Sequence, residues 1–145
     1  MYPQLTAILV ACAPALPTLV TMAACPVPKL AGTVVKARPP PSVFATVWPL
    51  LFLGLGVSFY RLECKWPILI LSVLLAVWQV LYSDRCGNNP KTACWCLLLC
   101  SAVGLVALSF AACEADKLSI ISLSCLVAWL LFAQNMNMLE VQHLS

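Results

Sequence analysis

The chain has 145 residues, of which 63% are hydrophobic and only 9% are charged, and its formal net charge is +3. Soluble domains carry about 25% charged residues, so this composition excludes an ordinary soluble domain and indicates a membrane protein. The small, scattered positive charge also argues against a nucleic-acid partner.

Five apolar runs predict an all-α membrane protein, a bundle of five transmembrane helices forming one domain over residues 1–145. A helix needs about 20 residues to cross the hydrocarbon core, and the runs cover 5–24, 43–62, 66–82, 93–113 and 118–139. The first run lacks the basic segment of a signal peptide, which favours a retained span. Short polar connections at 61–65 and 113–117 make the helices that they join antiparallel.

Five spans place the first connection, the third connection and the C-terminus on one side of the membrane. That side carries five basic residues and the other side three, namely Lys29, Lys36, Arg38, Arg85 and Lys91 against Arg61, Lys65 and Lys117. The positive-inside rule therefore predicts that the C-terminus and the first connection are cytoplasmic.

Most of the nine cysteines lie inside apolar runs, where thiols pack as small hydrophobic groups. No histidine or carboxylate accompanies them at the spacing of metal ligands, so we expect no metal site. Cys64 and Cys86 lie in polar connections, where lipidation and pairing are both open.

Two aromatic stripes converge in one half of the predicted bundle. Trp129, Ala133 and Asn137 follow the spacing i, i+4, i+8 and share one face of the fifth span. Trp48 and Phe52 are one turn apart near the start of the second span, which lies at the same membrane surface as the end of the fifth. Indoles stack on flat conjugated ligands, and an amide can orient such a ligand by hydrogen bonding. These five residues are therefore the candidate ligand-binding site. The basic first connection would lie above its mouth and meet ligand carboxylates.

Plainer interpretations of these residues stay open. Trp48 is also consistent with an interfacial aromatic belt, and Asn137 with the polar end of a helix. Trp78 and Tyr82 are typical of belt or packing positions. Trp129 lies about ten residues, or roughly 15 Å, from the end of its run, which is too deep for a belt.

Two stretches resemble signature motifs of the TspO/translocator-protein family, which is peripheral benzodiazepine receptor-like. In PPPSVFATVWPLLFLGLG the matching positions are Pro39, Pro40, Val43, Phe44, Val47, Trp48, Leu51 and Gly56. In LVAWLLFAQNMN they are Ala128, Trp129, Phe132, Ala133 and Asn137. The stretch APALP at 13–17 is similar to a first-helix motif of the family, with Pro17 in place of a glycine.

The resemblance implies a five-helix bundle, usually a homodimer, whose cavity opens toward the first connection. It implies porphyrin, haem, sterol or benzodiazepine-like ligands, a receptor or transport role, and ligand contacts at Trp48, Trp129, Ala133 and Asn137. For a eukaryotic or viral source it implies the mitochondrial outer membrane or another intracellular membrane.

The chain also departs from the family pattern. Ser42 stands where the family has a tryptophan, and Pro49 where it has a small or hydroxyl residue. Leu75 and Cys96 replace an asparagine and an aspartate, which removes polar groups from the expected cavity. Small residues four apart, Ser72 with Ala76 and Ala107 with Ala111, permit close helix contact within the chain or in a homodimer.

We therefore expect an integral membrane protein, surrounded by lipid, that binds a planar hydrophobic ligand for sensing, sequestration or transport. No paired carboxylates, Gly-rich phosphate loop or Ser/His/Asp set indicates an enzyme, and we expect no cofactor or metal, with porphyrin or haem entering only as ligand. Two alternatives stay open. One is light-dependent porphyrin degradation, for which the resemblance implies Trp48 and Trp129 as the reacting residues. The other is a structural membrane protein that acts through protein contacts.

Overall fold

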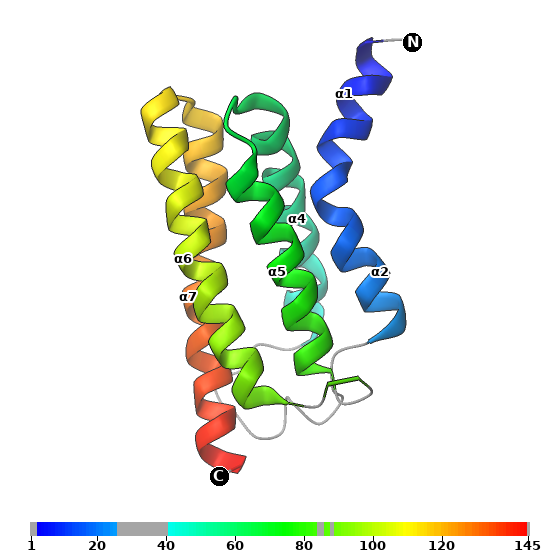
Figure 1. Ribbon diagram of the computed structural model, residues 1–145, viewed down its shortest axis with the longest axis vertical. Helices are drawn as coiled ribbons and strands as arrows, with labels where there is room; N and C mark the ends of the chain where they lie inside the picture. Colours follow the sequence, from blue (N-terminus) through cyan, green and yellow to red (C-terminus); the bar gives the residue numbers. More distant parts are fainter. Residues whose placement is uncertain (1–2, 26–40, 84–85, 88, 145) are drawn as a thin grey trace.

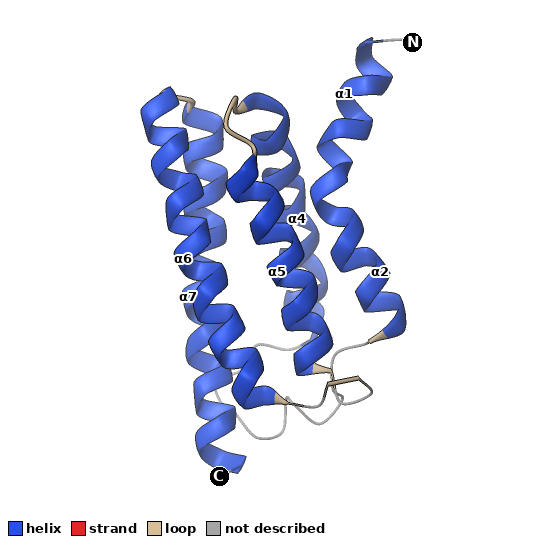
Figure 2. Cartoon of the chain, in the orientation of Figure 1, coloured by secondary structure: helices blue, strands red, loops and turns tan. Residues whose placement is uncertain are grey.

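The computed structural model describes residues 3–25, 41–83, 86–87 and 89–144, and every regular element in these ranges is helical (Figure 2). In chain order the helices are α1 (Pro3–Cys12), the 3-10 turn η1 (Ala13–Ala15), α2 (Leu16–Ala24), α4 (Pro41–Arg61), α5 (Trp66–Tyr82), α6 (Pro90–Glu114) and α7 (Lys117–Leu144) (Figure 1). Each predicted apolar run corresponds to helix, so the predicted all-α class is confirmed.

The first apolar run is one rod built from α1, η1 and α2. Pro14 and Pro17 have no N–H to donate, and the backbone between α1 and α2 tightens into the 3-10 turn at that point. Both α5 and α6 have a proline in their first turn, where a missing N–H costs nothing. Asn89 caps α6 because its side-chain oxygen accepts the N–H of Thr92 at 3.1 Å.

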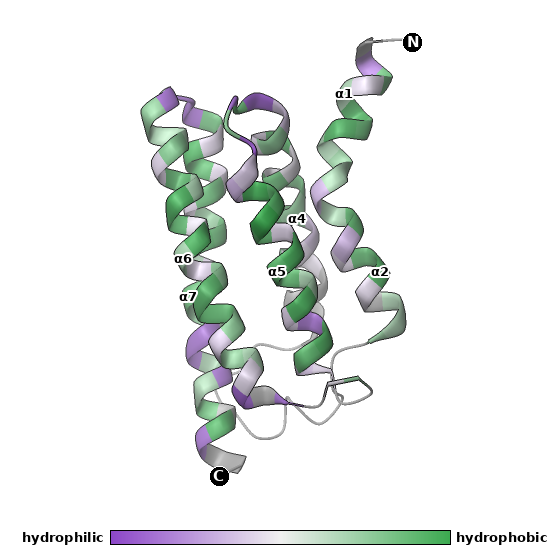
Figure 3. Cartoon of the chain, in the orientation of Figure 1, coloured by the Kyte–Doolittle hydropathy of each residue, from purple (hydrophilic) through white to green (hydrophobic). Residues whose placement is uncertain are grey.

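Three stretches in the described ranges are long and apolar enough to cross a membrane: Gln4–Thr21, Lys91–Glu114 and Lys117–Leu139. The helix α5 is a shorter apolar helix of 17 residues. Hydrophilic residues gather at the helix ends and on the C-terminal part of α7 (Figure 3). Large apolar side chains also face outward, for example Val20, Leu53 and Trp95, each more than 60% exposed. Such an exterior is compatible with a membrane protein; five crossings stay a prediction.

The helices form a closed ring. The first rod packs on α4 and on α5, α4 packs on α7, α7 on α6, and α6 on α5 (Figure 1). Leucines fill much of the interior, and the fully buried ones include Leu55, Leu71, Leu75, Leu97, Leu126 and Leu130. The four small residues that permit close helix contact, Ser72, Ala76, Ala107 and Ala111, are buried inside the chain. Their faces are therefore used within the ring, and a homodimer would need another surface.

Polar contacts hold one end of the ring together. The guanidinium of Arg61, at the end of α4, donates to both carboxylate oxygens of Asp116 at 2.7–3.1 Å. The carboxylate of Glu114 accepts the backbone N–H groups of Glu63 and Cys64. The ammonium of Lys65 donates to the carbonyl oxygens of Phe59, Tyr60 and Leu62, which satisfies the C-terminal end of α4. These contacts join the α4–α5 connection to the α6–α7 connection.

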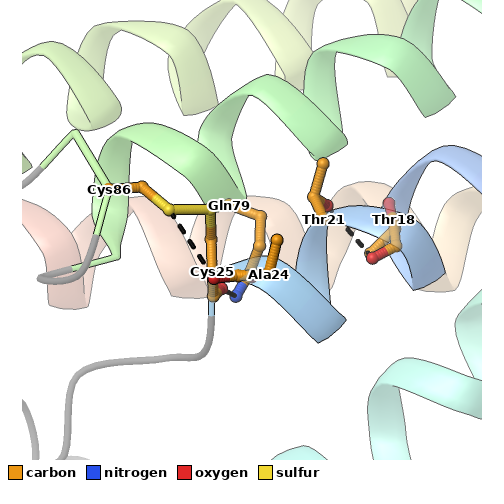
Figure 4. Close-up of a disulfide and its surroundings, with 6 residues drawn as sticks. All are labelled: Thr18, Thr21, Ala24, Cys25, Gln79 and Cys86. Atoms are coloured by element: carbon orange, nitrogen blue, oxygen red, sulfur yellow. Dashed lines mark hydrogen bonds between the residues drawn. A yellow bond between two sulfur atoms is a disulfide. The ribbon is translucent and has the colours of Figure 1, made fainter.

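A disulfide holds the opposite end. Cys25, just after α2, is bonded to Cys86, which follows α5, with 5.8 Å between their Cα atoms (Figure 4). The sequence left lipidation and pairing open for Cys64 and Cys86. In the structure Cys86 is paired and Cys64 is free.

Candidate functional site

The structure brings the two predicted aromatic stripes together inside the ring. Trp48 and Phe52 lie on α4, with 6.0 Å between their ring centroids. Trp129, on α7, meets Trp48 edge to face, at a centroid distance of 6.2 Å and an interplanar angle of 89°. Trp48 thus packs inward against its neighbours, as the ligand-site hypothesis requires.

The helix α5 supplies two further aromatic rings to this cluster. Trp78 lies 6.0 Å from Trp48 between ring centroids, and it stacks on Tyr82 at 5.2 Å with nearly parallel planes. Of the belt and packing roles considered for Trp78 and Tyr82, the structure favours packing. The predicted order of spans puts the end of α5 at the same end of the ring as the end of α7, but the local pattern did not mark Trp78 as a partner of Trp48. Phe132 joins the same group, with 5.3 Å between its ring centroid and that of Trp129. We call Trp48, Phe52, Trp78, Tyr82, Trp129 and Phe132 the aromatic cluster.

The aromatic cluster is closed in this structure. Trp48 touches both Trp78 and Trp129, so side chains fill the space that a ligand would occupy. Ala133, one turn beyond Trp129, is 7% exposed and belongs to the buried core against which Trp48 and Phe52 pack. The hollows that the described residues form beside Arg61 and between α2 and α5 are lined by none of the indoles.

Buried polar atoms without partners accompany the aromatic cluster. Asn137 is 4% exposed, yet its Nδ2 donates to no atom of the described residues. The indole Nε1 of Trp78 likewise has no partner in the described part of the chain. Gln134 uses its Nε2 for the Cys94 sulfur, at 3.4 Å, while its Oε1 stays unpaired among these residues. A buried donor without an acceptor is costly, and a ligand with polar edges would relieve that cost.

The basic first connection was expected above the mouth of the site. Lys29, Lys36 and Arg38 lie outside the described residues, so their distance from the aromatic cluster is not known. The described end of α2, the start of α4 and the ends of α5 and α7 do lie at the same end of the ring (Figure 1). This is the end to which Asn137 is closest along α7.

Two hollows in the described part of the chain lie away from the aromatic cluster. One, of about 570 Å³, is a shallow polar groove beside Arg61, Glu114 and Asp116. The other, of about 240 Å³, is an apolar groove between α2 and α5. The described residues contain no group of three histidine, cysteine or acidic side chains placed to hold a metal ion.

The polar groove carries the most perturbed carboxylate outside the apolar helix bodies. Hydrogen bonds from the Arg61 guanidinium, and then from the Ser119 hydroxyl, lower the pKa of Asp116 from 3.8 to about 2. The same ion pair raises the pKa of Arg61. The two charges satisfy each other, and the ion pair joins the end of α4 to the α6–α7 connection.

Comparison with known proteins gives no match: no family model, no curated protein and no solved structure resembles the chain significantly. The likeness to the TspO/translocator-protein family therefore stays a resemblance carried by the motifs around Trp48 and Trp129.

Proposed function

We propose that the chain is a five-span membrane protein that binds a flat hydrophobic ligand, a tetrapyrrole or a sterol, among α4, α5 and α7. One observation carries the proposal: three indoles meet in the ring of helices, and two turns beyond Trp129 on α7 the buried amide nitrogen of Asn137 has no partner among the described residues. Indole faces favour flat conjugated or fused-ring ligands, and the amide would bind a polar edge. The indoles gain packing energy from one another, but the unpaired amide nitrogen of Asn137 carries a cost that a ligand would remove.

The resemblance to the TspO/translocator-protein family supports the same proposal. The motifs of the family coincide with Trp48, Trp129, Ala133 and Asn137. Trp48 and Trp129 belong to the aromatic cluster, and Ala133 and Asn137 are buried further along α7. We accordingly propose a receptor-like or transport role in an intracellular membrane, with synthetic benzodiazepine-like compounds as further ligands. We include a homodimer in the proposal only because the family that the chain resembles usually forms one.

A second candidate function is light-dependent breakdown of a bound porphyrin. The contact between Trp48 and Trp129 favours it, because it places the two tryptophans side by side, where both could contact a bound porphyrin that molecular oxygen oxidises under light. In this reading the two tryptophans are reacting residues, and replacing either by phenylalanine abolishes the loss of porphyrin absorbance under illumination.

Fluorescence quenching by protoporphyrin IX in detergent, in the dark, tests binding. Trp66 and Trp95 are 51% and 67% exposed and would report on porphyrin in the micelle. Both are replaced by phenylalanine, so that only Trp48, Trp78 and Trp129 emit. We expect saturable quenching, and Asn137→Ala should weaken the apparent affinity about 2- to 10-fold, the value of one hydrogen bond of about 0.5–1.5 kcal/mol.

Asn135→Ala is the matched control, because Asn135 lies on the same helix but is exposed. It should bind porphyrin as the parent protein does. Competition by a sterol would indicate that both ligands use one site. Unsaturable quenching that is equal in the Asn137 and Asn135 variants would contradict the proposal and leave a structural role through protein contacts.

A further inference from the structure

The disulfide joins two segments that the membrane topology must place on the same side. Cys25 and Cys86 are 61 residues apart in sequence. Between them lie the first connection, α4, α5 and the start of the third connection. The bond can form only if the end of α2 and the end of α5 emerge at the same surface, as they do in Figure 1. The disulfide is thus a marker of one end of the ring.

A buried side chain holds Cys25 in position for this bond. Gln79, which is 3% exposed, donates its Nε2 to the carbonyl oxygen of Cys25 at 2.7 Å (Figure 4). Cys25 itself is 5% exposed, and Cys86 lies at the surface. The packing of α2 on α5 and this hydrogen bond therefore hold Cys25 beside Cys86.

Two cysteines near the opposite end are free thiols. Cys64, in the α4–α5 connection, and Cys113, in the last turn of α6, are both free. They belong to connected elements, because the N–H of Cys64 donates to Glu114, the residue that follows Cys113. Free thiols are not confined to that end, since Cys94, in the second turn of α6, is also free, so the orientation rests on the disulfide alone.

Disulfides persist in secretory, periplasmic or extracellular compartments, whereas the cytosol keeps thiols reduced. We infer that the end of the ring that carries Cys25, Cys86 and the end of α7 faces an oxidising compartment, the lumen of a secretory-pathway membrane or the cell exterior. The end with Arg61, Cys64 and Asp116 then faces the cytosol. This orientation is independent of any ligand.

The inferred orientation is opposite to the one that the basic residues predict. The positive-inside rule rests here on five residues against three, a margin of two. A covalent bond that needs an oxidising compartment is the stronger constraint. The need for an oxidising compartment also argues against the mitochondrial outer membrane, which the resemblance implies.

Glycosylation tags at the two ends of the chain test the orientation. One version of the full chain carries a tail with an Asn-X-Thr acceptor after Ser145, and a second carries the same tail before Met1. Each is translated in the presence of microsomes. Because the start of α1 and the end of α7 lie at opposite ends of the ring, exactly one tail should enter the lumen. We expect glycosylation of the C-terminal tail only. Glycosylation of the N-terminal tail, or of neither, would overturn the inference.

Counting thiols in the same microsomes tests the disulfide itself. The denatured, unreduced protein should take up seven alkylating groups and the reduced protein nine. Cys25→Ser with Cys86→Ser should show seven in both states, and Cys64→Ser should show six rising to eight. Nine groups before reduction in the natural chain would overturn the inference by removing its basis, whatever the tags show.

Discussion

At the residue scale, Ala115 is the one non-glycine residue with a positive φ in the described ranges, at 55°. It ends α6 in the left-handed conformation, where its N–H bonds to the carbonyl oxygens of Ala111 and Ala112. A Cβ is unfavourable there, and glycine is the residue that usually takes this position.

Ala115→Gly should therefore stabilise the protein by about 0.5–1 kcal/mol, since it removes the left-handed penalty and loses only part of the gain to a more flexible unfolded chain. The measurement is the thermal unfolding midpoint in detergent. Ala112→Gly, one turn earlier and helical, should lower the midpoint. A lower midpoint for Ala115→Gly would show that the conformation costs nothing.

Asp116 makes the stability depend on pH. Its pKa falls from 3.8 to about 2 on folding, so its contribution is complete above about pH 4 and disappears as the pH falls through 2. We expect the unfolding midpoint of the natural protein to drop between pH 4 and pH 2. Asp116→Asn should have a lower midpoint at pH 6 and a smaller drop over that interval.

Glu63→Gln is the control for this pH effect. Its carboxylate forms no ion pair in the described part of the chain, so the variant should keep the drop of the natural protein. An unchanged drop in Asp116→Asn would mean that another group causes it.

At the scale of the helices, a glycine sets the distance between α1 and α4. A Cβ at Gly56 would lie 2.0 Å from the carbonyl oxygen of Ala11, a separation that no folded protein tolerates. Only the absence of a side chain lets the first rod pack against α4. The family motif includes this glycine, and the structure provides its physical reason.

Gly56→Ala should cost about 1–3 kcal/mol, the usual range for overpacking, because backbone must move. The midpoint of unfolding measures it. In Gly54→Ala, on the same helix, the new Cβ would meet the Ser122 side chain at 3.1 Å, so the loss should be smaller. Equal losses in the two variants would mean that the contact with Ala11 does not control the effect.

At the scale of the whole molecule, the disulfide closes the contact between α2 and α5 across 61 residues. Removing it by Cys86→Ala should cost about 2–4 kcal/mol, since the unfolded chain regains freedom. A reductant should lower the unfolding midpoint of the natural protein and leave that of Cys86→Ala unchanged. Cys64→Ala, which alters a free thiol, should remain sensitive to reductant, and insensitivity of the natural protein would contradict the prediction.

Much of the fold could be predicted because membrane helices are encoded locally. Each apolar run became helix, with ends at residues such as Asn89 and Pro90 whose capping chemistry is local. The stripe of Trp129, Ala133 and Asn137 also followed from helical spacing alone. The meeting of Trp48 with Trp129 was predictable once the number of spans fixed which ends share a surface.

Other features needed contacts between distant segments. Nothing local distinguishes Trp78, which packs on Trp48, from Trp66, which is exposed. Cys25 has the same apolar neighbourhood as several free cysteines, and only the packing of α2 on α5 brings it to Cys86. The sequence also gave no sign that the rings of the aromatic cluster would close on one another.

By itself, then, the sequence predicted a lipid environment, the helices and the two aromatic stripes, because hydropathy and helical period act over a few turns. The tertiary structure alone decided the order of helices around the ring, the third indole, the unpartnered amide of Asn137 and the pairing of Cys25 with Cys86. Those depend on which helix faces lie together, and that is set by packing over the whole bundle.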